Sequence, residues 1–338
     1  MKNLSFAQKI LLIFTWIFTI LLLLAYLNPY IPVNLFPQLS LLSLIFPLLV
    51  SINLIFLIYW LVNLKKYFVI PLLILLLNYN NLNRLYQWKG KHSYDGKGIT
   101  IMSYNVRLFN DYQQIKRKAV DVDISNFLKD QHPDILLLQE FRPGKKTDFS
   151  QYQYKKLGLK GKRKQMGVVI FSKFPIINSG GFDFSNTYNN AIWADIKMGN
   201  DTVRVYNVHM QSHSVHPENI NNQDKLVVTH KISEVFKKQY FQAEQVKKHM
   251  EKSKYPVILG GDFNNTAFSA TYRLLKGNKY DAFVQAGQGF GFTWYYKYFP
   301  FRIDFLMIDQ SFFVKEYKTF SYVKYSDHKP IQALIKLK

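Results

Sequence analysis

Hydrophobic residues dominate the first 85 positions of the chain in long uninterrupted runs. Ile10–Leu27 is almost wholly apolar and has close to the roughly 20 residues that a membrane-spanning helix requires. Leu39–Leu64 is a second run of spanning length, and a proline within such a helix is tolerated in membranes. The pattern predicts two spanning helices joined by a proline-containing connection over residues 28–38.

A third apolar run, Tyr67–Leu77, is roughly half of a spanning length, although Tyr79 and Leu82 extend it. A secretory signal peptide is the alternative interpretation of the first run. No small-residue cleavage site follows that run, and further apolar runs do. We therefore expect residues 1–85 to form a helical membrane anchor with two or three spans.

Four lysines suggest how this anchor is oriented. Lys2, Lys9, Lys65 and Lys66 flank the apolar runs, and the positive-inside rule keeps such residues in the cytoplasm. If the third run spans, the rest of the chain lies outside the cytoplasm. If that run only enters the interface, the rest is cytoplasmic, which the basic residues after position 83 favour mildly. We predict a third span, and hence an integral protein of the bacterial inner membrane with an extracytoplasmic domain.

From residue 98 onward the pattern changes to short β-rich runs, after a linker at residues 86–97. Two longer stretches, Lys116–Lys129 and Ile232–Met250, place apolar residues at helical spacing. This mixture predicts an α/β domain, a sandwich with mixed sheets, over residues 98–338. The predicted strands are Ile99–Val106, Asp134–Leu138, Gly167–Phe171, Ala191–Ile196, Thr202–Val208, Pro256–Gly260, Ile303–Ile308, Phe320–Tyr325 and Ile331–Ile335.

Charge and composition narrow the possible partners. The chain has a net charge of +22, and the first 81 residues contain four of its 44 basic residues and none of its 22 acidic ones. A basic domain favours anionic partners such as nucleic acid, anionic lipid or phosphate-bearing substrates. The absence of cysteine excludes disulfides, zinc–thiolate sites and thiol nucleophiles.

Apolar strands in this domain repeatedly end in polar residues suited to metal or phosphate chemistry. Because the ends of neighbouring strands meet at one rim of a sheet, these residues are expected to build one pocket. Carboxylate and amide oxygens suit Mg²⁺, and histidines can contact phosphoryl oxygens or move protons near neutral pH. The candidates are Asn105, Glu140, His209, Asp262, Asn264, Asp304, Asp327 and His328.

Six motifs containing these candidates occur in a characteristic order: SYNVR, LLLQEF, YNVHMQS, GGDFNNT, RIDFLM and SDHKP. The series resembles the signatures of the endonuclease/exonuclease/phosphatase superfamily, which includes deoxyribonuclease-I-like nucleases, inositol-phosphate phosphatases and neutral sphingomyelinases. The resemblance implies a four-layer α/β sandwich. It also implies a metal-dependent phosphoric ester hydrolase that uses Mg²⁺, with Mn²⁺ able to substitute.

The resemblance further implies a metal-binding part of the site. Asn105 and Glu140 would hold the metal, with Asp327 nearby. Asp262 would orient or deprotonate the attacking water, and Asn264 would help to position that water and the phosphate.

The histidines would act on the phosphoryl group. His328 would contact this group and be held by Asp304 through its other ring nitrogen. His209 would stabilise the transition state or the leaving side. Abasic-site nucleases of the superfamily have a tyrosine at the position of His209, so abasic repair is an unlikely function.

The substrate stays open at this point, because the motifs address only the phosphate and the metal. A nuclease and a phospholipase- or sphingomyelinase-like enzyme are close to equal, with the lipid bilayer as a partner in either case. The alternative from another class is a catalytically silent membrane scaffold or binding module with the same fold.

Some remaining features have simpler interpretations. We interpret His213 and His216 as residues of a plain surface loop rather than metal ligands. Lys145-Lys146 and residues 162–164 are basic loops, solvated or in contact with an anionic substrate. The aromatic segment Gly289–Phe301 is expected in the core, with base stacking or insertion at a lipid interface as alternatives.

Overall fold

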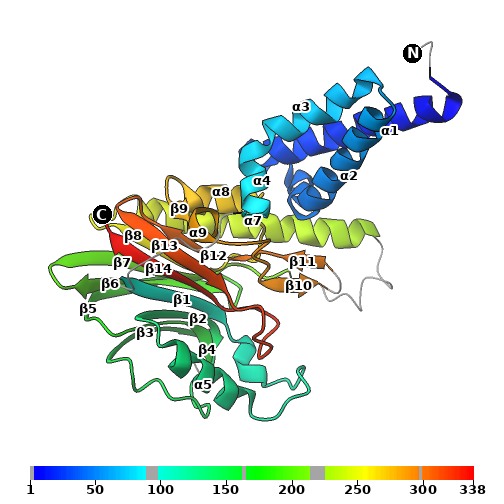
Figure 1. The fold of residues 1–338 in the computed structure, drawn as a ribbon. Coiled ribbons are helices and arrows are strands. Elements are labelled where there is room, and N and C mark those ends of the chain that lie inside the picture. Colours follow the sequence, from blue (N-terminus) through cyan, green and yellow to red (C-terminus); the bar gives the residue numbers. More distant parts are fainter. Residues whose placement is uncertain (1–3, 89–97, 162–164, 214–224, 297–298) are drawn as a thin grey trace.

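Two parts of different character follow one another along the chain, a helix bundle and an α/β sandwich (Figure 1). The structure is a computed structural model, and it describes residues 4–88, 98–161, 165–213, 225–296 and 299–338. The bundle lies on one side of the sandwich. The start of its first helix is at the end remote from the sandwich.

The bundle contains two apolar helices that are long enough to span a membrane. Its α-helices are α1 (Phe6–Leu27), α2 (Leu42–Val62), α3 (Val69–Leu77) and α4 (Tyr79–Leu85). Three 3-10 helices join them, namely η1 (Asn28–Tyr30), η2 (Pro37–Leu41) and η3 (Lys66–Phe68).

Polar side chains lie inside this bundle, and apolar side chains cover its outside. The Nε1 of Trp60 donates to the Thr15 hydroxyl at 2.9 Å, and Thr19 donates to the side chain of Asn53 at 2.9 Å. Ile55 and Leu73, in contrast, are more than half exposed. A helix pair in water would bury its apolar residues, whereas interhelical hydrogen bonds and an apolar outer surface are typical of helices in lipid.

The third apolar run continues beyond α3 into α4 and follows the whole length of the α1–α2 pair. Ile70 packs beside Trp60 at the end remote from the sandwich. Leu75 and Leu82 belong to the cluster of Leu22 at the other end. The polar break at Asn78 explains why this run looks short in the sequence.

The sandwich consists of two six-stranded sheets. In sheet order, the first contains β13 (Phe312–Thr319), β14 (Ile331–Leu337), β1 (Ile99–Asn105), β2 (Ile135–Phe141), β4 (Met166–Ser172) and β3 (Tyr154–Lys160). The second contains β5 (Ile176–Phe182), β6 (Asn190–Met198), β7 (Asp201–His209), β8 (Val257–Asp262), β12 (Asp304–Ile308) and β9 (Tyr280–Asp281). A separate hairpin is formed by β10 (Trp294–Tyr296) and β11 (Phe299–Phe301).

Helices cover both outer faces of the sheet pair (Figure 1). Residues of both sheets, such as Leu137 and Leu306, form the central core. The outer face of the first sheet packs against α5 (Val120–Gln131). That of the second packs against α7 (Lys225–Met250) and α8 (Ala270–Lys276), while the short α9 (Ala282–Ala286) follows β9. The predicted four-layer α/β sandwich is confirmed.

The predicted strand at Phe320–Tyr325 is wrong. Phe320 and Val323 are buried in the outer core of the first sheet, so their apolar pattern reflects packing in a turn. The strand of this region is β13, which precedes it. The sequence pattern also misses the short strands β9, β10 and β11, as well as β3 and β5, which are edge strands with polar residues and glycines.

Candidate active site

The backbone register brings the catalytic candidates of the second sheet into one row. His209 at the end of β7 lies opposite Asp262 in the parallel β7–β8 pair. Asp304 lies opposite the same Asp262 in the antiparallel β8–β12 pair. In the first sheet Asn105 ends β1, beside Gln139 of β2. Strand ends from both sheets therefore meet at one rim of the sandwich.

Two candidates have backbone conformations that are uncommon for residues other than glycine. Glu140 has φ +50° at an irregularity in the β2–β4 pairing, and Asn264 has φ +49° just after β8. A bulge of this kind re-aims side chains. Gln139 consequently points into the sandwich and donates to Asn207 at 2.7 Å, whereas Glu140 reaches the rim. Such backbone strain is often stored at functional sites.

Asn105 connects the carboxylates of the two sheets. Its Nδ2 donates to Asp262 Oδ2 at 3.0 Å and to Glu140 Oε1 at 3.3 Å. Burial raises the pKa of Glu140, although His328 and this hydrogen bond oppose the shift. Burial also raises the pKa of Asp262 to about 6. The burial of these two carboxylates thus outweighs the stabilisation that neighbouring side chains give to their negative charges.

His328 and Asp304 form a buried pair. Nδ1 of His328 lies 2.9 Å from Asp304 Oδ2, and its Nε2 lies 3.7 Å from Asp262 Oδ2. Burial alone would lower the pKa of His328, but Asp304 and Asp262 together outweigh this effect and raise it well above the usual value. The imidazole is therefore protonated at neutral pH, with Nε2–H beside the carboxylate of Asp262.

His209 has the opposite character. Burial lowers its pKa, so the ring is neutral near pH 7. Its Nε2 lies 3.7 Å from Asp262 Oδ2 and 3.8 Å from Glu140 Oε1, too far for hydrogen bonds. Within the described part of the chain this buried atom has no hydrogen-bond partner. A buried polar atom of this kind calls for a ligand or water that satisfies it.

Two groups of side chains could hold a divalent cation. Glu140 and Asp262 offer carboxylate oxygens, which suit Mg²⁺, while Asn105 between them directs its Nδ2 at both and its Oδ1 accepts from the backbone N–H of Arg107. The ligand atoms of Asp262, Asp304 and His328 also lie within 4.8 Å of one another. Hydrogen bonds already join members of both groups, so a cation would take the remaining carboxylate oxygens.

Asp327 lies at the margin of this cluster. Its Oδ2 is 3.4 Å from Arg107 Nη1 and accepts from Trp294 Nε1 at 3.4 Å. Arg107 and Trp294 are thus residues of the site region that the sequence analysis did not assign. Arg107 is the last residue of the SYNVR motif, which was the available signal, and Trp294 lies within the aromatic segment.

Asn264 is fixed by contacts on every side. Its backbone N–H donates to Asp262 Oδ1 at 2.8 Å, and its Nδ2 donates to the Met210 carbonyl at 3.0 Å. Its own carbonyl accepts from Gln239 Nε2 at 2.9 Å and lies 3.0 Å from His213 Nε2. These contacts hold the left-handed conformation in place.

The interpretation of His213 as a plain surface residue is therefore wrong. Its ring packs edge-on against Phe236, and burial lowers the pKa of His213 to about 4. The reason is the α7 helix, which covers this loop. His216 and residues 162–164 lie outside the described residues.

The other basic and aromatic candidates differ in their contacts and in their exposure to solvent. Lys145 pairs with Asp111. In the aromatic segment, Gly291 and Thr293 are buried, whereas Phe290, Tyr295 and Phe299 are exposed. The segment is thus only partly core.

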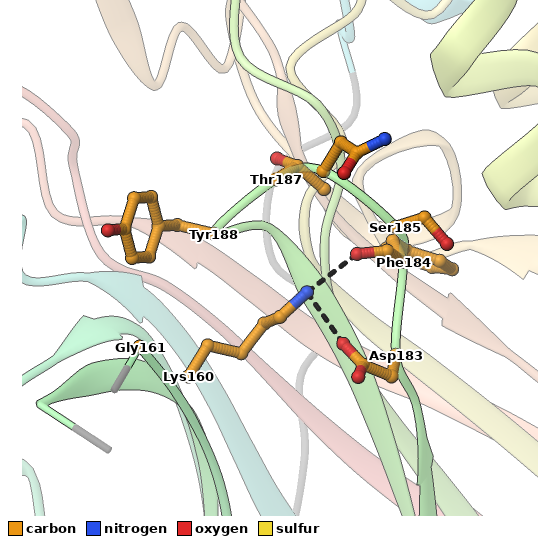
Figure 2. Close-up of a pocket in the computed structure, with 8 residues that line it drawn as sticks. Lys160, Gly161, Asp183, Phe184, Ser185, Thr187 and Tyr188 are labelled. Atoms are coloured by element: carbon orange, nitrogen blue, oxygen red, sulfur yellow. Dashed lines mark hydrogen bonds and ion pairs between the residues drawn. The ribbon is translucent and has the colours of Figure 1, made fainter. Parts of the chain in front are cut away.

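An open hollow elsewhere on the sandwich is lined by the end of β3 and the β5–β6 loop (Figure 2). Lys160 extends across it, forms an ion pair with Asp183 and donates a hydrogen bond to the carbonyl of Phe184. None of the eight predicted site residues lines this hollow.

Solved structures with the same fold agree with this architecture. D. rerio TDP2 complexed with a single-strand DNA product has a TM-score of 0.55 at 18% identity, covering 71% of this chain and 99% of that one. An endonuclease/exonuclease/phosphatase family protein from Bacteroides thetaiotaomicron has a TM-score of 0.52 at 19% identity, and the match covers 72% of this chain and 100% of that one. One from Beutenbergia cavernae has a TM-score of 0.54 at 16% identity, covering 71% and 72%.

Sequence comparisons divide the chain as the fold does. A family described as a domain of unknown function matches residues 8–85. No curated protein gives a significant match. The model of the endonuclease/exonuclease/phosphatase family matches residues 102–328, which is more than half of the chain, and the chain therefore belongs to that family.

Proposed function

We propose that this chain is a membrane-anchored, Mg²⁺-dependent phosphodiesterase that cleaves phosphodiester bonds of nucleic acid or phospholipid by attack of water. The observation that carries the proposal is the arrangement around Asp262. This buried carboxylate has His209 and His328 at 3.7 Å and is hydrogen-bonded to Asn105. A silent scaffold would have no need to retain all eight predicted residues.

The acidic and amide side chains have two roles, water activation and metal binding. Asp262, with a pKa of about 6, can accept a proton from water near neutral pH, and Asn264 beside it positions that water. Glu140 and Asn105 would hold the cation, with Asp327 nearby. When bound, Mg²⁺ neutralises charge on the phosphoryl oxygens.

The two histidines have different roles toward the phosphoryl group. Protonated His328, held by Asp304, donates from Nε2 to a phosphoryl oxygen. Neutral His209, in the tautomer with its proton on Nε2, would donate from this otherwise unpartnered atom to the developing charge in the transition state or to the leaving oxygen.

Different observations favour each substrate class. The net charge of +22 and the DNA product bound by D. rerio TDP2 favour nucleic acid. The apolar bundle and the exposed Phe290 and Phe299 favour a phospholipid. The test is Mg²⁺-dependent hydrolysis by the purified chain of DNA, RNA, sphingomyelin and phosphatidylinositol phosphates. Absence of turnover on every substrate with both Mg²⁺ and Mn²⁺ would contradict the proposal.

The bundle also supports a topology. Lys9 and the Lys65-Lys66 pair lie at the end of the bundle remote from the sandwich, whereas α4 returns to the sandwich. The positive-inside rule then places the sandwich outside the cytoplasm after three crossings.

We predict the labelling pattern that follows from this topology. The chain contains no cysteine, so a single introduced cysteine reports on its own position. In intact spheroplasts, a membrane-impermeant maleimide should label Asp201→Cys, at the exposed start of β7. Asn63→Cys, exposed at the remote end of the bundle, should react only after lysis. The reverse pattern would place the sandwich in the cytoplasm.

A further inference from the structure

Besides its contacts with α7 and α8, the helix bundle reaches the two segments that carry the catalytic carboxylates. One contact joins the start of α2 to the segment after Asp262. The other joins the end of α4 to the segment before Asp304. Asp262 and Asp304 are direct neighbours across β8 and β12, so both contacts lie close in sequence to the same pair of carboxylates.

The first contact depends on a proline in α2. A proline has no N–H, so Pro47 leaves the carbonyl of Ser43, four residues earlier, without its helical partner. The hydroxyl of Thr266 donates to this carbonyl at 2.9 Å, and the contact is fully buried. Phe46 stacks on Phe268 beside it, with ring centroids 4.0 Å apart. A gap in the α2 hydrogen-bond ladder is thus filled by the catalytic domain.

The second contact uses a helix end. Arg302 is buried and pairs with Asp281 at 2.8 Å, and its Nη2 donates to the carbonyl of Arg84 at 3.1 Å. Carbonyls in the last turn of a helix lack intrahelical partners, and here one of them is satisfied by the sandwich. Two residues beyond Arg302 the chain reaches Asp304.

We propose that the membrane bundle is a positioning part of the active site, acting through Thr266 on the loop of Asp262 and Asn264. Thr266 lies two residues after Asn264, whose left-handed backbone is held by contacts within the sandwich, and its hydrogen bond to Ser43 anchors the next part of the same loop to α2. Small displacements of catalytic groups cost much activity, about 10²-fold for 1 Å. This inference rests on the proposed phosphodiesterase function for its kinetic test, and a second readout is independent of it.

The test uses the full-length protein in lipid nanodiscs. Thr266→Val keeps the shape but removes the donor, and should lower kcat about 10-fold while KM changes little. Thr266→Ser keeps the donor and should restore kcat. Pro47→Ala returns an N–H to compete for the Ser43 carbonyl, so it should raise the thermal stability of the protein yet lower kcat. A purely structural role would move stability and kcat in the same direction.

The control is Phe56→Ala, which removes a buried phenylalanine from the same helix about 15 Å from Phe46. It should lower stability and leave kcat unchanged. Hydrogen–deuterium exchange of residues 262–268 should rise in Thr266→Val and Pro47→Ala but not in Phe56→Ala, whether or not a substrate is known. Unchanged exchange and kcat in both loop-contact variants would overturn the positioning role. Altered exchange in a protein without any hydrolytic activity would instead contradict only the proposed function.

Discussion

Glu140→Gln is expected to lower kcat/KM by roughly 10³-fold, because it removes the charged oxygen donor of the proposed cation site. The amide keeps the shape of the side chain, and the hydrogen bond from Asn105 can be retained. What is lost is the negative charge that attracts a hard divalent cation. If that cation contributes about 4 kcal/mol to transition-state stabilisation, its loss corresponds to a factor of about 10³.

The same variant should show a weaker dependence on Mg²⁺. The measurement is the initial rate as a function of Mg²⁺ concentration, together with direct Mg²⁺ binding by calorimetry. Glu251→Gln, at an exposed ion pair at the end of α7, is the matched control and should behave like the natural protein. Wild-type turnover and unchanged Mg²⁺ affinity in Glu140→Gln would remove Glu140 from the metal site.

The fold could be predicted well from the sequence because its strongest signals are local. Apolar strands with polar ends, such as ITIMSYN before Val106, require no knowledge of the rest of the chain. The motif order supplied the four-layer architecture. The edge strands β3 and β5 could not be found in this way, since a strand with one solvated side has only a weak apolar pattern.

The candidate site was predictable in its residues but not in its geometry. The bulge that separates the directions of Gln139 and Glu140 depends on pairing with β4 and leaves no local signal. The burial of His213 depends on α7, a later helix whose Phe236 packs against the ring.

The link between Thr266 and Ser43 joins residues far apart in the chain. Pro47 was visible in the sequence, but only the structure shows which donor satisfies the carbonyl that it frees. Long-range contacts of this kind are the part of the site that residue patterns could not supply.

The His328–Asp304 pair gives a prediction in which pH separates electrostatics from structure. Asp304 and Asp262 outweigh the effect of burial and raise the pKa of His328 well above its usual value, so the imidazole of the natural protein is protonated at neutral pH. Asp262, with a pKa of about 6, must lose its proton to act as a base. The rate should therefore fall below about pH 6 and again at alkaline pH, where His328 loses its proton.

Asp304→Asn should lower kcat by on the order of 10²-fold or more, because the carboxylate that orients and charges His328 is gone. With that charge removed, the pKa of His328 falls, so the alkaline limb of the pH–rate profile should move to lower pH. The amide can still accept from Nδ1–H, and its other atom takes the place of Asp304 Oδ1, which has no hydrogen-bond partner among the residues that the structure describes. The fold should consequently be retained, as circular dichroism can verify, and Asp183→Asn at an exposed carboxylate is the matched control. An alkaline limb at its original pH in Asp304→Asn would show that Asp304 does not set the protonation of His328, and that the pair has a structural role alone.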